Sequence, residues 1–108
     1  MRVLIALFTL LAPALAQQPT LLVLLKGASA LAYYSMDGKL LHKVPVGQHP
    51  HEMVLSADGK HVFITDNGVM RIENAGKGGN TVSVVDLAAK KRVDTIGFGR
   101  YRRPHGLA

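Results

Sequence analysis

The residues best suited to chemistry are two histidines that each follow a proline. The pairs are Pro50-His51 and Pro104-His105, and Glu52 comes directly after His51. Neutral imidazoles bind transition metals or a haem iron, and a carboxylate can act as a further ligand or a general base. His51 and His105 are therefore candidate metal ligands. The competing interpretations are that the histidines line a water-filled channel and that Glu52 is a solvated surface charge.

A second candidate is a short basic segment that contains an aromatic residue. Arg100, Arg102 and Arg103 surround Tyr101. Guanidinium groups bind carboxylates or phosphates through paired hydrogen bonds and also stack on aromatic rings. The predicted ligand-binding site consists of these four residues together with the two histidines and the glutamate, and its predicted ligand is a small anion. The alternative is a loop that carries only solvated charge.

The remaining basic features do not indicate a specific ligand. The chain has 13 Lys and Arg against 7 Asp and Glu, a formal charge of +6, but no nucleic-acid motif accompanies this charge. The basic run at 90–92 is expected on a hairpin, in solvent. The Gly-Lys-Gly-Gly run at 76–79 lacks the spacing and the helix of a phosphate-binding loop. Nucleic acid is therefore not an expected partner.

The first residues have the pattern of an export signal. Arg2 precedes an apolar run at 3–15, and Ala14-Leu15-Ala16 fits cleavage by signal peptidase. We expect residues 1–16 to be a helical signal peptide that is removed, which predicts a periplasmic or secreted chain with no membrane attachment after cleavage. An uncleaved anchor is the alternative. The chain has no Cys, so disulfides and thiolate metal sites are excluded.

The rest of the chain has the pattern of an all-β protein. Short apolar or β-branched runs recur between turn signals such as the Asp-Gly pairs at 37–38 and 58–59, without helical periodicity. Two runs, at 53–55 and 62–64, are apolar on consecutive residues, which predicts strands buried on both faces by stacked sheets. Seven strands are predicted, at residues 21–26, 30–35, 40–46, 51–56, 61–65, 81–86 and 92–96.

The sequence also repeats itself. Val46-Gly47 followed by Pro50-His51 returns as Ile96-Gly97 followed by Pro104-His105. The repeat is longer than the roughly 40 to 45 residues of a four-stranded propeller blade. Two segments hold the surplus, one at 98–103 and a Gly-rich one at 68–79.

This repeat resembles the YVTN repeat of bacterial β-propellers, a group that is similar to lactonase-like and cytochrome d1-like propellers. Phe63-Ile64-Thr65-Asp66 stands where the family has Tyr-Val-Thr-Asn. The run Ser-Ala-Asp-Gly-Lys at 56–60 stands for Ser-Pro-Asp-Gly-Lys, and Asn-Thr-Val-Ser-Val-Val-Asp at 80–86 differs from the family form at one position. The resemblance covers 50–108 well and 21–47 loosely.

The resemblance implies a partial β-propeller of about two blades. Residues 17–47 would be the last three strands of a first blade that lacks its inner strand, 48–97 a second blade with an inserted loop at 68–79, and 98–108 the start of a third. The chain would then be an N-terminal fragment whose partners are the missing C-terminal blades or another protein chain. Because neighbouring strands alternate in direction, the loops that carry the predicted ligand site would share one rim.

Two classes of function stay open. The favoured one is an exported scaffold that binds a ligand or a protein on this rim, without catalysis and without a cofactor. The alternative is a piece of a propeller enzyme or redox module, such as a lactonase-like hydrolase or a haem- or metal-binding propeller. No catalytic constellation can be assembled from so few strands, so no catalytic residue is predicted. Haem or metal is expected only when further blades complete a ring of ligands.

Overall fold

All regular elements in the described part of the chain are β-strands. The computed structural model describes residues 20–73 and 76–108, so the predicted signal peptide at 1–16 lies outside the described residues. Within these ranges no helix is long and apolar enough to cross a membrane. The seven predicted strands are confirmed, each boundary within one residue. They are β1 (Thr20–Leu25), β2 (Ala30–Ser35), β3 (Leu40–Pro45), β4 (Pro50–Leu55), β5 (His61–Asp66), β6 (Thr81–Asp86) and β7 (Lys91–Gly97).

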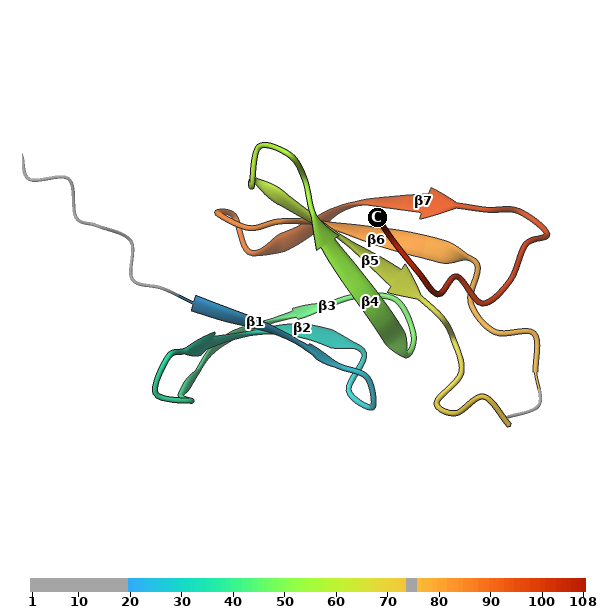
Figure 1. Cartoon of the computed structure of the whole chain (residues 1–108), viewed down its shortest axis with the longest axis horizontal. Helices are drawn as coiled ribbons and strands as arrows, with labels where there is room; N and C mark the ends of the chain where they lie inside the picture. Colours follow the sequence, from blue (N-terminus) through green and yellow to red (C-terminus); the bar gives the residue numbers. More distant parts are fainter. Residues whose placement is uncertain (1–19, 74–75) are drawn as a thin grey trace, which may run out of the picture.

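The strands form two antiparallel sheets, which lie one against the other (Figure 1). The order is β1-β2-β3 in the first sheet and β4-β5-β6-β7 in the second, so every strand pairs with its neighbour in sequence. This order requires only tight turns within each sheet, except for the long connection between β5 and β6. Gly38 and Gly59, in two of the turns, have φ angles of 85° and 69°, a region that glycine enters without steric cost.

The core lies between the two sheets. Leu31 and Val44 of the first sheet pack in one cluster with Val62, Ile64 and Val85 of the second, and each of these side chains is at most 2% exposed. Val62 and Ile64 are two residues apart on β5, so they point to the same face of the sheet. Burial of apolar surface contributes about 25 cal/mol per Å² and is the main force that joins the sheets.

The opposite face of the second sheet is partly open to solvent. Phe63 on this face is only partly buried, although Val82 and Val84 beside it are 3% and 7% exposed. The expectation that the runs at 53–55 and 62–64 are buried on both faces is therefore confirmed only in part. The reason is that β1–β3 cover one face of the second sheet and no described residue forms a third sheet on the other.

The open face of the second sheet corresponds to the face of the first sheet that packs in the core. Val46 and Ile96 occupy equivalent positions in the sequence repeat. Val46 is 8% exposed because it packs in the core between the sheets, whereas Ile96 is 41% exposed. The exposed face of the second sheet therefore resembles the face of the first sheet that the second sheet covers. It is the kind of surface on which a further unit would pack.

The connections divide between the two ends of the sheets, as the alternation of strand direction requires. Figure 1 shows the β1–β2 turn, the β3–β4 loop and the β5–β6 loop at one end, with the segment that follows β7. The other turns lie at the opposite end. We call the first end the rim.

A buried carboxylate joins the two sheets below the rim. Asp66 is 2% exposed and accepts hydrogen bonds from Thr81 Oγ1 at 2.7 Å and Ser83 Oγ at 2.9 Å. Ser83 Oγ accepts in turn from the backbone N–H of Gly47, at 3.0 Å, in the segment that links the sheets. This chain of hydrogen bonds fixes the linker against the second sheet, because a buried polar group without a partner costs about 1–3 kcal/mol.

The repeat supplies a matched pair of glycines that tests this junction. A Cβ added to Gly47 would overlap the side chain of Asp66, whereas a Cβ added to Gly97, its repeat equivalent, meets nothing within 4 Å. We expect Gly47→Ala to lower the free energy of unfolding by about 3 kcal/mol, the upper part of the range for overpacked sites. Gly97→Ala should leave it nearly unchanged. Urea denaturation measures both, and equal effects of the two substitutions would contradict the junction described here.

Tyr33 gives a second test of the packing. Its side chain is buried, and its hydroxyl has no hydrogen-bond partner among the described residues. Burial, with a smaller contribution from the Asp86 carboxylate, raises the pKa of Tyr33 above its ordinary value of 10.0. The stability that depends on neutral Tyr33 is therefore complete below about pH 10 and is lost as the pH rises further, where the unfolded chain ionises first.

We expect Tyr33→Phe to keep the free energy of unfolding at neutral pH or to raise it by up to about 1 kcal/mol, because it removes a buried hydroxyl that has no partner among the described residues. The variant should also lose less stability than the wild-type chain as the pH rises above 10. Denaturation at pH 7 and pH 10.5 measures both effects. A clear destabilisation at pH 7 would show that the hydroxyl has a stabilising partner.

Candidate functional site

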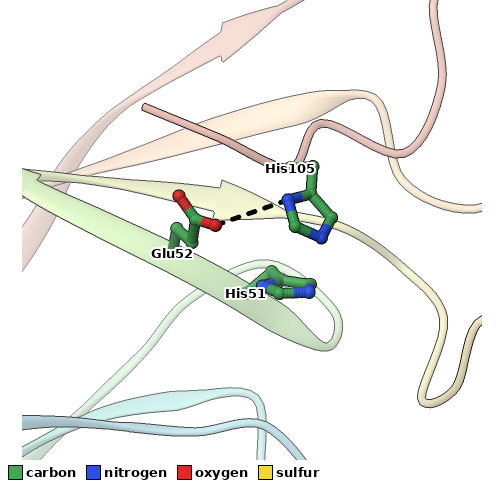
Figure 2. Close-up of side chains that lie close together, drawn as sticks. All are labelled: His51, Glu52 and His105. Atoms are coloured by element: carbon green, nitrogen blue, oxygen red, sulfur yellow. Dashed lines mark ion pairs between the residues drawn. The ribbon is translucent and has the colours of Figure 1, made fainter. Parts of the chain in front are cut away.

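His51 and Glu52 lie on β4 at a break in its pairing with β5. The register shifts between Pro50 and Met53. Consecutive residues of a regular strand point to opposite faces, whereas a β-bulge redirects a side chain. At this bulge the side chains of His51 and Glu52 lie on the same side of β4, toward the segment that follows β7 (Figure 2). Two side chains that could bind a metal ion thus come from adjacent positions in the sequence.

His105 reaches the same place from the segment after β7. The Thr65 hydroxyl donates to the carbonyl of His105 at 3.1 Å and accepts from the backbone N–H of Glu52 at 3.0 Å. The Asn67 side chain donates to the carbonyl of Pro104 at 3.2 Å. Thr65 and Asn67 are buried, so the end of β5 holds both backbones in fixed places.

Arg103 fixes the direction in which the chain enters Pro104. Its φ angle is 57°, a left-handed conformation that is uncommon for residues other than glycine. Its backbone N–H donates to the carbonyl of Gly79 at 2.8 Å, and its guanidinium donates to the carbonyl of Gly76 at 2.7 Å. These bonds join the segment after β7 to the β5–β6 loop and hold the unusual backbone conformation.

The three side chains are close enough to act together (Figure 2). The rings of His51 and His105 have centroids 3.9 Å apart and planes inclined by 47°. His105 Nδ1 lies 3.3 Å from Glu52 Oε1, and the side chains of His105 and Glu52 are 64% and 42% exposed. Each residue offers one ligand atom within 4.8 Å of the other two. The cluster is therefore compact and accessible from solvent.

A pocket of about 250 Å³ lies next to this cluster. It has three cationic side chains, from the end of β1, the β5–β6 loop and the segment after β7, and none of its described lining residues is acidic. An apolar wall, two imidazoles and one side-chain amide complete it. The lining residues are Lys26, His51, Asn67, Val69, Arg71, Ile72, Arg103 and His105.

The predicted basic cluster does not lie in one place. Arg103 lines the pocket, but Arg100, Tyr101 and Arg102 are not among its lining residues. The guanidinium of Arg100 stacks over the ring of Tyr101, 5.3 Å from its centroid, and donates to its hydroxyl at 3.4 Å. Of the seven predicted site residues, the structure thus brings together His51, Glu52 and His105, with Arg103 beside the two histidines.

Several residues at the rim were not predicted from the sequence as part of the site. Lys26 ends an apolar strand, where a single lysine looks like ordinary solvated charge, and Asn67 and Arg71 begin a loop without a recognised motif. For Asn67 the available signal was the resemblance to the YVTN repeat, because the stretch that matches Tyr-Val-Thr-Asn contains Thr65 and ends next to Asn67. His49, also at the rim, is structural: its Nδ1 lies 3.2 Å from the carbonyl of Lys26 and must be the donor.

Comparison with known proteins supports the fold. No protein-family model matches the chain, and no curated protein matches its sequence. Among solved structures, a chain of hydrazine synthase from Kuenenia stuttgartiensis, a protein that contains a β-propeller, superposes with a TM-score of 0.62 at 20% sequence identity. The match covers 77% of this chain and 22% of that one. At this identity the likeness concerns the fold alone: the chain is all-β, with two sheets arranged as in a partial β-propeller.

The Thr65 hydroxyl can be tested as the residue that positions the cluster. We expect Thr65→Val, which keeps the shape and removes the hydroxyl, to lower stability by about 1–3 kcal/mol and to release the segment that carries His105. Nuclear Overhauser contacts between the rings of His51 and His105 should then weaken or disappear. Thr95→Val on the exposed strand β7 is the matched control. Ring contacts that persist in Thr65→Val would assign the positioning to other groups.

Proposed function

We propose that this chain belongs to an exported β-propeller of the YVTN type that binds a small anionic ligand in the rim pocket. The observation that carries the proposal is the charge of the pocket: Lys26, Arg71 and Arg103 line it, and none of its described lining residues is acidic. The three cations come from three separate segments. That three segments each bring a cationic residue to one pocket supports a binding role for an anion.

The remaining lining favours an organic anion. Val69, which is 8% exposed, and Ile72 provide apolar surface, while Asn67 adds an amide. Ligand pockets combine apolar walls with a few polar groups that fix the orientation of the ligand. A carboxylate or phosphate monoester with a small apolar part fits this lining better than a free inorganic anion.

Backbone hydrogen bonds hold the loops around the pocket, which favours a preformed binding site. The β3–β4 loop is held by a hydrogen bond from the N–H of Gly68 to the carbonyl of Gln48, at 2.9 Å, and the β5–β6 loop by one from Gly79 to Asn67, at 2.8 Å. Loops fixed on a sheet in this way are a common place for binding residues. Export to the periplasm or out of the cell, proposed from the first sixteen residues, would expose the pocket to extracytoplasmic ligands.

The open face of the second sheet indicates a further partner. We propose that another blade, from the same polypeptide or from another chain, covers Ile96 and Phe98, which are each 41% exposed. The support is the repeat: Val46 is buried at the equivalent of Ile96. Repeat proteins bury such faces by stacking one unit on the next.

An enzyme or redox module is the second candidate function, and one observation favours it. The cluster of His51, Glu52 and His105 has the donor groups of a metal centre with open coordination positions. The chemistry of that cluster is considered separately below, because it does not depend on the anionic ligand.

Phenyl phosphate and inorganic phosphate test the pocket directly. Isothermal titration of the purified chain should show phenyl phosphate binding more tightly than phosphate, since the apolar wall contacts only the former. Lys26→Gln should weaken phenyl phosphate binding about tenfold, the equivalent of about 1.4 kcal/mol for the loss of one charged partner. Lys39→Gln, in the turn at the opposite end of the sheets, is the matched control. Equal affinity in the two variants, or no binding of either probe, would refute the proposal.

A further inference from the structure

Three donor groups of the kind that bind transition metals meet at the rim (Figure 2). His51 and Glu52 come from the bulge in β4, and His105 comes from the segment after β7. One ligand atom from each lies within 4.8 Å of the other two. Two imidazoles and one carboxylate form a donor set that suits first-row divalent transition metals, whereas Mg²⁺ and Ca²⁺ prefer sites made only of oxygen.

The distances are close to those of a bound ion. In a tetrahedral zinc site with ligand bonds of about 2.1 Å, two ligand atoms lie about 3.4 Å apart. Glu52 Oε1 and His105 Nδ1 already lie 3.3 Å apart. The longest separation in the cluster is at most 4.8 Å. Small side-chain rotations can close it, because the side chains of His105 and Glu52 are 64% and 42% exposed and have room to turn.

The backbones that carry the ligands are held independently of any ion. Thr65 Oγ1 accepts from the N–H of Glu52 and donates to the carbonyl of His105, so one buried hydroxyl connects two of the three ligand residues. The Asn67 amide holds Pro104, the residue before His105. A metal therefore meets a site in which only side-chain rotations remain to be ordered, which lowers the entropic cost of binding.

We infer that His51, Glu52 and His105 bind one divalent transition-metal ion, with Zn²⁺ as the simplest occupant. Three protein ligands leave at least one coordination position for water or for a ligand from the adjacent pocket, whose wall includes both histidines. The sequence alone predicts a metal only when further blades complete a ring of ligands, but these three residues all belong to the present chain. The inference goes beyond anion binding and stands without it.

The structure also defines what the cluster is when no metal binds. His105 Nδ1 then lies 3.3 Å from Glu52 Oε1 in a partly exposed contact, which is an ion pair when the imidazole is protonated, and the tilted ring of His51 packs against that of His105. Partly exposed pairs contribute at most about 1 kcal/mol to stability. This state predicts no selective affinity for Zn²⁺, so metal titration separates the two interpretations.

The experiment is isothermal titration of Zn²⁺ and Mg²⁺ into the purified chain, stripped of metal with a chelator and free of any affinity tag. We expect one Zn²⁺ per chain and no binding of Mg²⁺. His51→Ala and His105→Ala should each weaken Zn²⁺ binding by more than about 100-fold, since even the loss of an outer-shell partner costs about 10- to 100-fold. Thr65→Val should weaken binding less, through positioning alone.

The chain offers a matched control in His61. His61 Nε2 lies 3.8 Å from Asp86 Oδ2, so this pair has an imidazole and a carboxylate but is not part of the three-ligand group. His61→Ala should leave Zn²⁺ affinity unchanged. Lys26→Gln should also leave it unchanged while it weakens phenyl phosphate binding, which separates failure of this inference from failure of the anion proposal.

Nuclear magnetic resonance of the wild-type chain tests the site even where a variant fails to fold. The ring nitrogens of His51 and His105 should shift on addition of Zn²⁺, and those of His42, His49 and His61 should not. Substitution of Zn²⁺ by Co²⁺ should produce visible absorption bands of a tetrahedral or five-coordinate ion. Absence of 1:1 binding, or equal shifts at all five histidines, would overturn the inference.

Discussion

The position of one buried carboxylate determines how the two sheets meet and how the rim is built. Asp66 is almost fully buried and accepts hydrogen bonds from Thr81 and Ser83 of the next strand, and Ser83 in turn holds the backbone of Gly47. Apolar packing between the sheets supplies most of the attraction, but it is not directional. The hydrogen bond from the backbone N–H of Gly47 to Ser83 Oγ supplies direction, because it forms only when the linker passes at one height across the end of β5. Asp66 holds Ser83 in the position to accept it. The lack of a side chain at Gly47 is what lets the linker come so close.

The same strand end also organises the candidate site. Thr65, Asp66 and Asn67 are consecutive, and successive side chains at a strand end point to opposite sides. Asp66 therefore serves the junction between the sheets, while Thr65 and Asn67 bind the backbone of the segment after β7. Because all three side chains are buried, a change at the junction would be transmitted to His105 within one or two residues. The geometry of the cluster of His51, Glu52 and His105 is thus linked to the packing of the sheets, although the cluster itself is accessible from solvent.

The strands could be predicted almost to the residue because their signals are local. Turn dipeptides and β-branched runs fix where strands such as β5 and β6 begin and end, and the repeat predicted that they belong to stacked sheets. Burial could not be predicted in the same way, because the exposure of Phe63 and Ile96 depends on which faces of the sheets find a partner. At the site, the repeat drew attention to His51 and His105, but the bulge at Pro50–Met53 that turns Glu52 toward them has no sequence signature. The basic run at 100–103 looked like one cluster, and the left-handed conformation of Arg103 divides it between the pocket and solvent.

The cluster of His51, Glu52 and His105 can be understood as a consequence of repetition. Two successive units that each begin their inner segment with Pro-His must place these histidines side by side, since stacked units bring equivalent positions to neighbouring places around the axis. The ring centroids of His51 and His105, 3.9 Å apart, show how close that approach is. Repetition alone would give only a pair of imidazoles, and two like groups that can both become positively charged gain nothing from proximity. The bulge in β4 changes this outcome, because it adds the Glu52 carboxylate on the same side and completes a donor set of mixed charge. A local irregularity in a repeated framework is therefore what converts a structural repeat into a site with the chemistry to hold an ion.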